Sequence, residues 1–261
     1  MTGPRGPRRA RPVAPSGAGA RGAIVGGRRA VAEAIRAGLV EEVLIAVGAR
    51  STPGLRDLRA EARQAGVSVR ETTARLLDSL APAHQGVAAQ VRMPRPMGER
   101  ELRTWSFDED ALVVILDGVT DPQNLGAAAR AAEAAGASIL VFRERRSAGV
   151  TAAAVRASAG ALLHLPHARV ANLARALETL KDRGFSVVGL DERAEASIHD
   201  AERPPGPLAL VVGSEGTGMS RLVREACDQL VRLPMLGRVA SLNAASALAA
   251  VLYGYALRRD N

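Results

Sequence analysis

The stretch Ala111-Leu-Val-Val-Ile-Leu-Asp117 decides the fold of the larger part of this 261-residue chain. Six consecutive apolar residues precede the aspartate. They do not alternate with polar residues, as they would in a strand with one solvent-exposed face. Such a run is typical of a strand buried on both faces of a parallel sheet. Helix-like and strand-like patterns then alternate along the rest of the sequence, and this alternation predicts a doubly wound α/β domain over residues 106–261.

The other elements of this domain are predicted from the spacing of its apolar residues. We expect helices over residues 124–135, 151–158, 171–181, 219–227 and about 242–257. We expect further strands over residues 138–142, 162–165, 185–190, 207–213 and 229–233. Ligands of such sheets bind beyond the carboxyl ends of the strands, so the loops at those ends are where a site is expected.

A second, smaller α/β unit is predicted over residues 22–92. Here we expect helices over residues 28–37, 54–64 and 72–80, and strands over residues 41–47, 67–69 and 86–91. The sequence Arg92-Met-Pro-Arg-Pro-Met-Gly98 follows, with two prolines and one glycine among charged residues. This composition predicts an interdomain linker over residues 93–105.

Residues 1–21 consist mainly of Pro, Gly, Ala, Ser and Arg without an apolar period, which predicts disorder. Seven arginines and no acid precede Glu33: Arg5, Arg8, Arg9, Arg11, Arg21, Arg28 and Arg29. Removing these 7 from the 35 basic residues leaves 28 against 27 acidic ones, so the excess charge lies in the segment before Glu33. A basic arm attracts phosphate backbones without reading sequence. A tail that only aids solubility is the alternative.

The composition also excludes several kinds of site. The single cysteine, Cys227, rules out an internal disulfide and a cysteine-based zinc site, and it fits a reducing cytoplasm. The four histidines lack the spacing of zinc ligands, so we expect no metal. No apolar run is long enough to span a membrane. Aromatic residues make up only 2%, which disfavours an RNA-binding platform built on stacking.

The first segment with chemical potential follows the strand that ends at Asp117. Pro122 keeps the loop extended, and Asn124 stands where a side chain can cap the next helix. Arg130 lies about one and two-thirds turns further on, among small neighbours that leave it room to reach a phosphate. The same residues also fit a capped helix with a solvated arginine, so this segment alone does not establish a site.

The second segment, Gly213-Ser-Glu-Gly-Thr-Gly218, has three glycines after a buried strand. Glycine allows positive φ and a close approach of the backbone to a ligand. The order of the glycines matches neither the dinucleotide fingerprint nor a P-loop. Glu215 would repel a phosphate, but it could hydrogen-bond a ribose hydroxyl or accept a proton. A tight turn without a ligand is the alternative.

The third segment, residues 233–243, leads from the last strand into a helix of mostly Ala and Leu. Ser241 or Asn243 could cap this helix, which is the simplest interpretation. The two polar residues also flank Leu242 at the mouth of a very apolar helix, and packing alone does not explain that arrangement.

Together, the three segments closely resemble the three motifs of the SpoU (TrmH) family of RNA ribose 2'-O-methyltransferases, in the right order and spacing. The resemblance extends from Ala111 to about Arg258 and includes the segment Ala157–Pro166. Gly27–Ile35 and His84–Val87 are similar to the small L30e-like RNA-binding domain of that family. The most similar subgroup is the bacterial 23S rRNA guanosine-2'-O-methyltransferases.

This resemblance implies S-adenosylmethionine as methyl donor, a deep trefoil knot of the SPOUT type, and a homodimer. Topological rules would instead predict an unknotted sheet. The resemblance also implies that the donor binds at Gly213, Leu233 and Leu242, with Leu190 nearby. Backbone groups would bind the adenine edge while the leucines pack on the ring.

The resemblance further implies roles in catalysis. Arg130 matches the catalytic arginine proposed for the family, but arginine normally stays protonated. We therefore expect Arg130 to bind the substrate phosphate and orient the 2'-hydroxyl, with Glu215 or the phosphate itself accepting the proton. Asn124, Ser241 and Asn243 would hold Arg130 and the loops in place.

The sequence departs from the family at Ala244 and Ala245, where valine and a hydroxyl residue are common, and we expect little effect on function.

The expected target is a guanosine of 23S rRNA in the cytoplasm. A tRNA, or an rRNA adenosine whose methylation blocks an antibiotic, would be modified by the same chemistry. The N-terminal unit disfavours the simplest tRNA enzymes, which often use short terminal extensions. A non-catalytic ribosome-binding module is a third hypothesis, and the presence of both Arg130 and Glu215 argues against it. The expected partners are RNA and a second copy of the chain, without a membrane.

Overall fold

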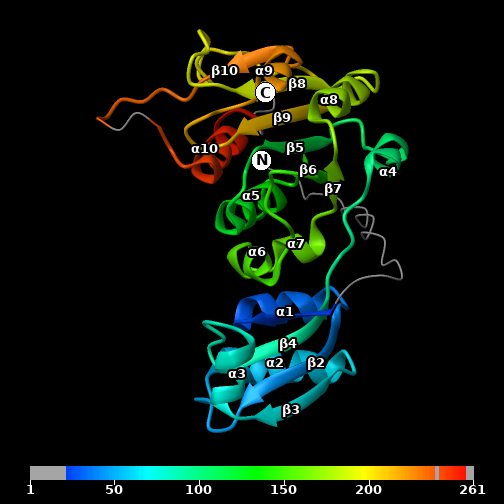
Figure 1. Ribbon diagram of the computed structural model, residues 1–261, viewed down its shortest axis with the longest axis vertical. Helices are drawn as coiled ribbons and strands as arrows, with labels where there is room; N and C mark the ends of the chain where they lie inside the picture. The colour runs from blue at the N-terminus through cyan, green and yellow to red at the C-terminus, as the bar shows by residue number, and fades with distance from the viewer. Residues whose placement is uncertain (1–21, 239–240, 257–261) are drawn as a thin grey trace, which may run out of the picture.

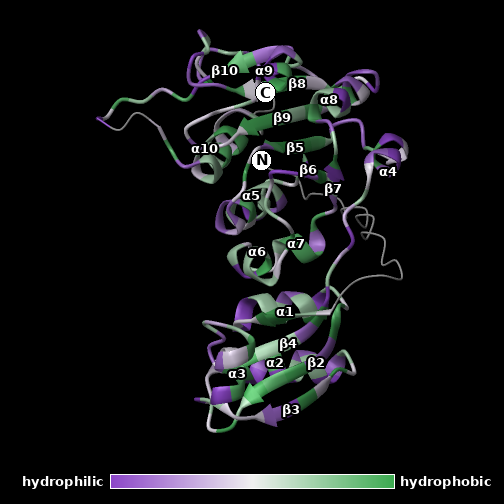
Figure 2. Cartoon of the chain, viewed as in Figure 1, coloured by the Kyte–Doolittle hydropathy of each residue, from purple (hydrophilic) through white to green (hydrophobic). Residues whose placement is uncertain are grey.

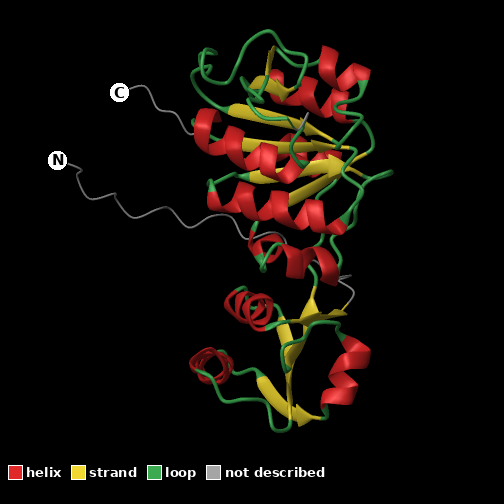
Figure 3. Ribbon diagram, turned by 90° about the vertical axis from the view of Figure 1, so that its left-hand side faces the viewer, coloured by secondary structure: helices red, strands yellow, loops and turns green. Residues whose placement is uncertain are grey.

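The computed structural model describes residues 22–238 and 241–256, which form two sheets with their helices (Figure 1). The predicted disordered tail, residues 1–21, lies outside the described residues. The rotated view in Figure 3 shows the two sheets as separate layers, each with helices beside it. Each sheet with its helices is called one α/β unit.

The small unit contains a four-stranded sheet in the order β1-β4-β2-β3. Its strands are β1 (Gly22–Gly26), β2 (Val40–Ala46), β3 (Ser68–Thr72) and β4 (Val87–Arg92). Only β2 and β3 run parallel, and the other pairs are antiparallel. Its helices are α1 (Arg28–Arg36), α2 (Pro53–Gln64) and α3 (Ala74–Leu80). The strand β1 was not predicted from the sequence, because it directly adjoins the tail without a turn signal of its own.

The large unit contains a six-stranded, fully parallel sheet in the order β10-β8-β9-β5-β6-β7. Its strands are β5 (Leu112–Asp117), β6 (Ile139–Arg143), β7 (His167–Val170), β8 (Ser186–Leu190), β9 (Leu208–Gly213) and β10 (Gln229–Val231). All six residues of β5 are buried at the centre of the sheet, as its continuous apolar sequence predicts. Figure 2 shows the central strands as the most hydrophobic layer of this unit.

Helices cover both faces of the large sheet, which confirms the predicted doubly wound α/β arrangement. The helices of the large unit are α4 (Glu99–Thr104), α5 (Pro122–Ala134), α6 (Ala152–Ala157), α7 (Ala161–His164), α8 (Leu173–Lys181), α9 (Arg221–Glu225) and α10 (Ala244–Val251), of which α6 and α7 pack on α5. A π-helix, η1 (Leu252–Ala256), continues α10. The side chains of β5 alternate between two separate cores, with Val114 in the core of α5 and α10 and Ile115 in the core of α4 and α8.

One predicted strand is wrong. Residues 162–165 were expected to form a strand, but they lie in and just after the short helix α7, and the strand β7 follows at His167. Leu162 and Leu165 are both buried, so their burial fits either a strand or a buried helix. The polar residues His167 and Arg169 obscure the true strand, because His167 is a buried polar residue.

The predicted linker, residues 93–105, is largely part of the large unit. It contains α4, whose Leu102 is buried in the core, and Met97 pairs with Ala168 of β7. The Glu99 carboxylate accepts hydrogen bonds from the backbone N–H groups of Ala171 and Asn172 at 3.0 and 3.3 Å. The proline-rich composition therefore marks the change of domain, while the helix after it belongs to the second core.

The two units contact each other through α1, β1 and the loop at Pro82 of the small unit and through α6 and α7 of the large one. Glu33 of α1 and His164 of α7 form a contact of 3.0 Å between Oε2 and Nε2. The Arg156 guanidinium donates to the carbonyl oxygen of Pro82 at 2.8 Å. A Cβ at Gly160 would come within 2.4 Å of the Glu33 Cβ, so glycine allows this close approach. These contacts fix the small unit against the large one.

Candidate active site

The three segments singled out in the sequence meet at the carboxyl edge of the large sheet. Strands β5 and β9 are hydrogen-bonded neighbours, and Asp117 lies opposite Gly213 where both strands end. The segment after β10 returns to the same edge before α10, and α10 packs against α5. Figure 1 shows α5 and α10 on the same face of the sheet. The parallel topology therefore brings together residues that are more than a hundred positions apart in the chain.

Asn243 is the residue that connects the three segments. Its Oδ1 accepts from the Ala245 N–H at 3.0 Å and caps α10, as the sequence predicts. Its Nδ2 donates to Asn124 Oδ1 at 2.8 Å and lies 3.4 Å from Glu215 Oε2. One side chain thus joins the first turn of α5, the glycine loop and the start of α10.

The first segment differs from its prediction in one detail. The N-cap of α5 is Asp121, whose Oδ1 accepts from the Gln123 N–H at 3.0 Å, and Pro122 occupies the first helical position. Asn124 therefore lies inside the first turn and does not cap the helix. Proline at this position is common because its missing N–H would lack a helical partner anyway. The Asn124 side chain is left to bind Asn243.

The glycine loop after β9 folds back on itself in a tight turn. Ser214 N donates to the Gly218 carbonyl at 3.1 Å, and Gly218 N donates to the Ser214 carbonyl at 2.9 Å. Gly216 and Gly218 have φ of 81° and 68°, values that favour glycine. A Cβ at Gly213 would come within 2.1 Å of the Gly218 carbonyl carbon. The glycines therefore allow two stretches of backbone to pass within contact distance of each other. They also set the shape of the loop that borders the cleft described next.

Asp117 holds this loop to the strand before it. Its side chain is only 4% exposed, and its Oδ1 accepts from Arg143 Nε at 2.7 Å. Its Oδ2 accepts from the Ser220 N–H at 2.7 Å, just after the glycine loop. The buried carboxylate is thus paired with a charge and a backbone donor, as a buried ion must be.

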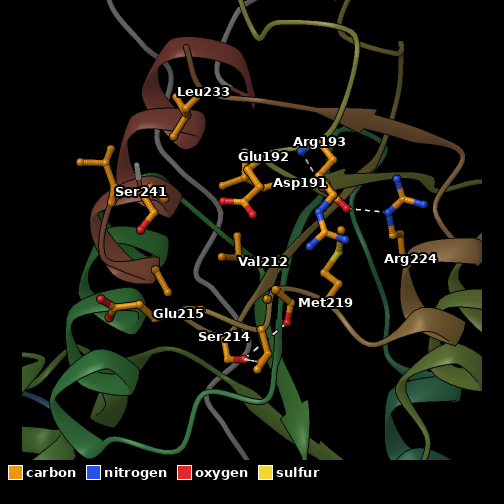
Figure 4. A pocket seen from close by; sticks show the side chains of 18 of the residues that line it. Asp191, Glu192, Arg193, Val212, Ser214, Glu215, Met219, Arg224, Leu233 and Ser241 are labelled. Carbon is orange, nitrogen blue, oxygen red and sulfur yellow. Dashed lines mark hydrogen bonds and ion pairs between the residues drawn. The ribbon is translucent and has the colours of Figure 1, made fainter. Parts of the chain in front are cut away.

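An open cleft of about 200 Å³ lies between the loops after β8, β9 and β10 (Figure 4). Much of its wall is apolar: Leu190, Val212, Met219, Leu233, Met235, Leu242, Ala244 and Ala247. Backbone from Gly213 to Gly218 forms another side of the cleft. An apolar wall beside exposed backbone amides and carbonyls suits a flat heterocycle with a polar edge.

One end of the cleft is charged, with Asp191, Glu192 and Arg193 from the loop after β8 and Arg224 from α9. Asp191 Oδ2 accepts from Arg224 Nε at 2.6 Å, and Asp191 Oδ1 accepts from the Arg193 N–H at 2.8 Å. Burial alone would raise the pKa of Asp191, but these hydrogen bonds outweigh it and hold the pKa below its ordinary value. Asp191 is therefore an ionised anchor for Arg224.

Arg130 lies on the exposed side of α5 and is not part of the cleft wall. Within residues 22–238 and 241–256, its side chain makes no hydrogen bond or ion pair. An exposed guanidinium without a protein partner can bind an anion from solution, because its five N–H donors fit a phosphate well.

The structure thus places the predicted residues in three groups. Six of them line the cleft: Leu190, Gly213, Glu215, Leu233, Ser241 and Leu242. Asn124 and Asn243 connect the segments beside it, and Arg130 stands apart on α5. The charged residues at the end of the cleft were missed. The run of three charged residues directly after the strand 185–190 is the sequence signal for this end, whereas Arg224 lies 33 residues beyond Asp191 and gives no local signal.

The described residues also bear on metal binding, membrane insertion and thiol chemistry. Among these, no group of His, Cys, Asp and Glu is placed to hold a metal ion. No helix in this part of the chain has the length and apolar character needed to cross a membrane. Burial raises the pKa of the Cys227 thiol to about 12, so this cysteine is a poor nucleophile at neutral pH.

Comparison with known proteins identifies both units. The SpoU rRNA Methylase family matches residues 111–253, and the family described as RNA 2'-O ribose methyltransferase substrate binding matches residues 24–97. The first match covers more than half of the chain and includes the whole carboxyl edge of the large sheet. The second covers the small sheet and the beginning of the predicted linker.

Individual relatives agree with these matches. An uncharacterized tRNA/rRNA methyltransferase of Mycobacterium leprae is 41% identical over 237 residues, covering 89% of this chain and 76% of that protein. The 23S rRNA (guanosine-2'-O-)-methyltransferase RlmB of Photobacterium profundum is 40% identical, covering 78% of this chain and 84% of that protein. The SpoU methyltransferase AviRb of Streptomyces viridochromogenes, solved in complex with AdoMet, has a TM-score of 0.74 at 30% identity, covering 90% of this chain and 89% of that one.

Proposed function

The chain belongs to the SpoU rRNA methylase family of RNA 2'-O-ribose methyltransferases, and we propose that it methylates a guanosine ribose of 23S rRNA with S-adenosylmethionine. The target follows the relative named as a 23S rRNA guanosine-2'-O-methyltransferase, which is 40% identical. The donor follows the solved relative that binds AdoMet, which is S-adenosylmethionine. The observation that carries the proposal is the contact of Asn243 with both Asn124 and Glu215, because it joins the three family motifs beside one cleft.

The cleft fits S-adenosylmethionine by the chemistry of its walls. Leu190, Leu233 and Leu242 would pack on the adenine ring, and the backbone around Gly213 would bind the polar edge of the ring. The bound donor supplies a methyl group on a positively charged sulfur. Glu215 lies on the same wall, where its carboxylate would favour this positive charge.

The chain's own residues then have to position the RNA. Arg130 would bind a phosphate beside the target nucleotide and so orient the 2'-hydroxyl toward the methyl group. The 2'-oxygen held in this way would take the methyl group that the bound donor supplies from its sulfur. The hydroxyl proton passes to Glu215, the carboxylate that Asn243 holds at 3.4 Å. Asn124 would fix Asn243, and Ser241 lines the cleft.

The small unit would bind the RNA around the target. Its match to the substrate-binding family supports this role, and we propose that it has an L30e-like fold over residues 22–92. The basic residues 1–21 would add attraction to phosphates without reading sequence. We propose the corresponding division of the chain: residues 22–92 bind RNA, residues 93–105 connect the two parts, and residues 106–261 form the catalytic domain.

The loop between β8 and β9 supports the expected trefoil knot. Ile198 N donates to the Arg232 carbonyl at 2.9 Å, just after β10. Tyr255 Oη donates to the Glu202 carbonyl at 3.0 Å, and Arg203 Nε donates to the Ala256 carbonyl at 2.9 Å. The loop therefore contacts both the beginning and the end of the C-terminal segment, as a loop that encircles this segment must. A crystallographic trace with the whole loop on one side of residues 232–256 would remove the knot.

We also propose that the enzyme acts in the cytoplasm as a homodimer. Two large apolar side chains of the C-terminal segment are exposed, Leu236 at 97% and Tyr253 at 58%, and a second copy could cover them. Cytoplasmic location follows from the proposed rRNA substrate. Sedimentation of the full chain should give the mass of two copies, and a monomer at micromolar concentration would contradict the dimer.

Methyl transfer to rRNA in vitro tests the proposed reaction. The purified full chain is incubated with unmodified rRNA and S-adenosylmethionine that carries a labelled methyl group, and the nucleosides are then separated. We expect label in 2'-O-methylguanosine of 23S rRNA. Label in 2'-O-methyladenosine, or in tRNA only, would keep the chemistry and change the target. Label on a base would contradict the reaction.

A further inference from the structure

The charged end of the cleft is not used by the mechanism above. Glu192, Arg193 and Arg224 line the cleft; in Figure 4, Arg193 and Arg224 lie on the side away from Leu233 and Ser241, and Glu192 lies between the two sides. Arg224 binds Asp191 through Nε only, so its two terminal nitrogens are outside this pair. Within the part of the chain that the structure describes, those nitrogens make no hydrogen bond. The cleft therefore has an apolar region and a separate region with donors for an anion.

The proposed methyl donor has matching parts. Its adenine fits the apolar region, while its other end carries a carboxylate and an ammonium group. The guanidinium groups of Arg193 and Arg224 and the carboxylate of Glu192 line this charged end. The Asp191 carboxylate is already paired with Arg224. Guanidinium binds carboxylate through parallel hydrogen bonds, and a free carboxylate binds ammonium.

Resting on the proposed function, we infer that this charged end binds the amino acid part of S-adenosylmethionine. Arg224 and Arg193 bind its carboxylate, and Glu192 binds its ammonium group. Asp191 is a positioning residue, because its carboxylate is paired with Arg224 and holds that guanidinium at the cleft. Its side chain is 12% exposed, against 44% for Arg224, which fits an anchor below a ligand-facing group.

The same arginines could instead bind an RNA phosphate, and the geometry favours the donor. Both arginines belong to the wall of the cleft that also contains Leu190, Gly213 and Leu242. Arg130 and the proposed RNA-binding unit lie outside this wall. A small ligand that reaches from the apolar region to the charged end would contact both, whereas an RNA backbone would have to enter the cleft.

Two ligands that differ only in the amino acid part separate these possibilities. S-adenosylhomocysteine carries the amino acid, and 5'-methylthioadenosine lacks it. Their dissociation constants are measured by titration calorimetry with the full chain and with the variants Arg224→Gln and Asp191→Asn. Arg221→Gln is the matched control, because Arg221 lies on the same helix, pairs with Glu225 at 2.7 Å and does not line the cleft.

We expect Arg224→Gln to weaken S-adenosylhomocysteine about ten- to a hundredfold, as the loss of a charged hydrogen bond implies. Asp191→Asn should weaken the same ligand, less strongly. Neither variant should change the affinity for 5'-methylthioadenosine, which also shows that the cleft is folded, and Arg221→Gln should change neither ligand.

Equal losses for both ligands, or no loss for S-adenosylhomocysteine, would overturn the inference. So would weaker RNA binding of Arg224→Gln with unchanged S-adenosylhomocysteine binding. If the unmodified chain binds neither ligand, the proposed methyl donor itself is wrong, and the inference falls with it.

Discussion

Removal of the amide that links Asn243 to Asn124 should measure how strongly the three segments are joined. Asn243 has two tasks, because its Oδ1 caps α10 and its Nδ2 donates to Asn124 at 2.8 Å. Asn243→Ser keeps a capping oxygen but is too short to reach Asn124. Asn243→Ala removes both tasks. Asn124→Ala removes the link from the other side.

The expected magnitudes come from these contacts. A hydrogen bond between partly buried neutral groups contributes about 1 kcal/mol to stability. Loss of an N-cap costs about 1 kcal/mol more. Asn243→Ser should therefore lower the free energy of unfolding by about 1 kcal/mol, and Asn243→Ala by about 2 kcal/mol. The contact with Glu215 at 3.4 Å is longer and exposed, so we assign it no separate share.

Urea unfolding of a double-mutant cycle isolates the link. The cycle uses the unmodified chain, Asn124→Ala, Asn243→Ser and the double variant, with S-adenosylhomocysteine absent so that ligand binding does not add stability. We expect a coupling energy of about 1 kcal/mol between the two positions. The rate of methyl transfer should fall in both single variants, because Glu215 and the glycine loop lose their connection to α5.

A coupling energy near zero would refute this reasoning. It would mean that Asn124 and Asn243 stabilise their own helices independently. Equal losses for Asn243→Ser and Asn243→Ala would show in addition that the cap contributes nothing.

Three further predictions concern other parts of the fold. Gly213→Ala should destabilise the chain and abolish cofactor binding measured by calorimetry, because its Cβ would lie 2.1 Å from backbone. The control Gly237→Ala should have little effect, because nothing lies within 4 Å of its Cβ. A larger effect of Gly237→Ala than of Gly213→Ala would contradict the role of Gly213 in the tight crossing of the chain. Asp117→Ala should lower stability by about 3 kcal/mol in urea unfolding, since Arg143 and Ser220 N lose a buried partner; a loss under about 1 kcal/mol would argue against this role. Burial holds the pKa of His167 below its ordinary value, so as the pH falls the unfolded chain binds a proton at this residue before the folded chain does. The contribution of His167 to the free energy of unfolding should therefore be complete above about pH 6.5 and should be lost as the pH drops toward 5. His167→Gln should flatten this dependence of stability on pH, and an unchanged slope would exclude His167 as its source.

Much of the fold could be predicted from the sequence, because apolar spacing directly reports burial. The run from Ala111 to Leu116 predicted the central strand, and the alternation after it predicted the parallel sheet. The prediction failed where burial and periodicity disagree. Buried leucines of α7 were interpreted as a strand, and the strand β7 was hidden by His167 and Arg169. The short helix α9, Arg221–Glu225, is also shorter than its predicted range.

The site was predictable in its parts and less so in its assembly. Each of the three segments follows a strand, so the parallel sheet explains why they meet at one edge. The hydrogen bond from Asn243 to Asn124 spans 119 positions, and no local pattern indicates it. The pairing of Asp191 with Arg224 depends in the same way on how α9 packs beside β8. Single residues far apart in the chain carry no signal until the fold brings them together.

The most direct test of the proposed activity is the content of 2'-O-methylguanosine in 23S rRNA from cells with and without this protein. Mass spectrometry of the digested nucleosides, followed by mapping of fragments, gives the level at each position. We predict that one position loses its methyl group when the protein is absent. The methyl group should return when the unmodified chain is supplied, but not when Arg130→Ala is supplied. An unchanged level of 2'-O-methylguanosine at every position would contradict the account.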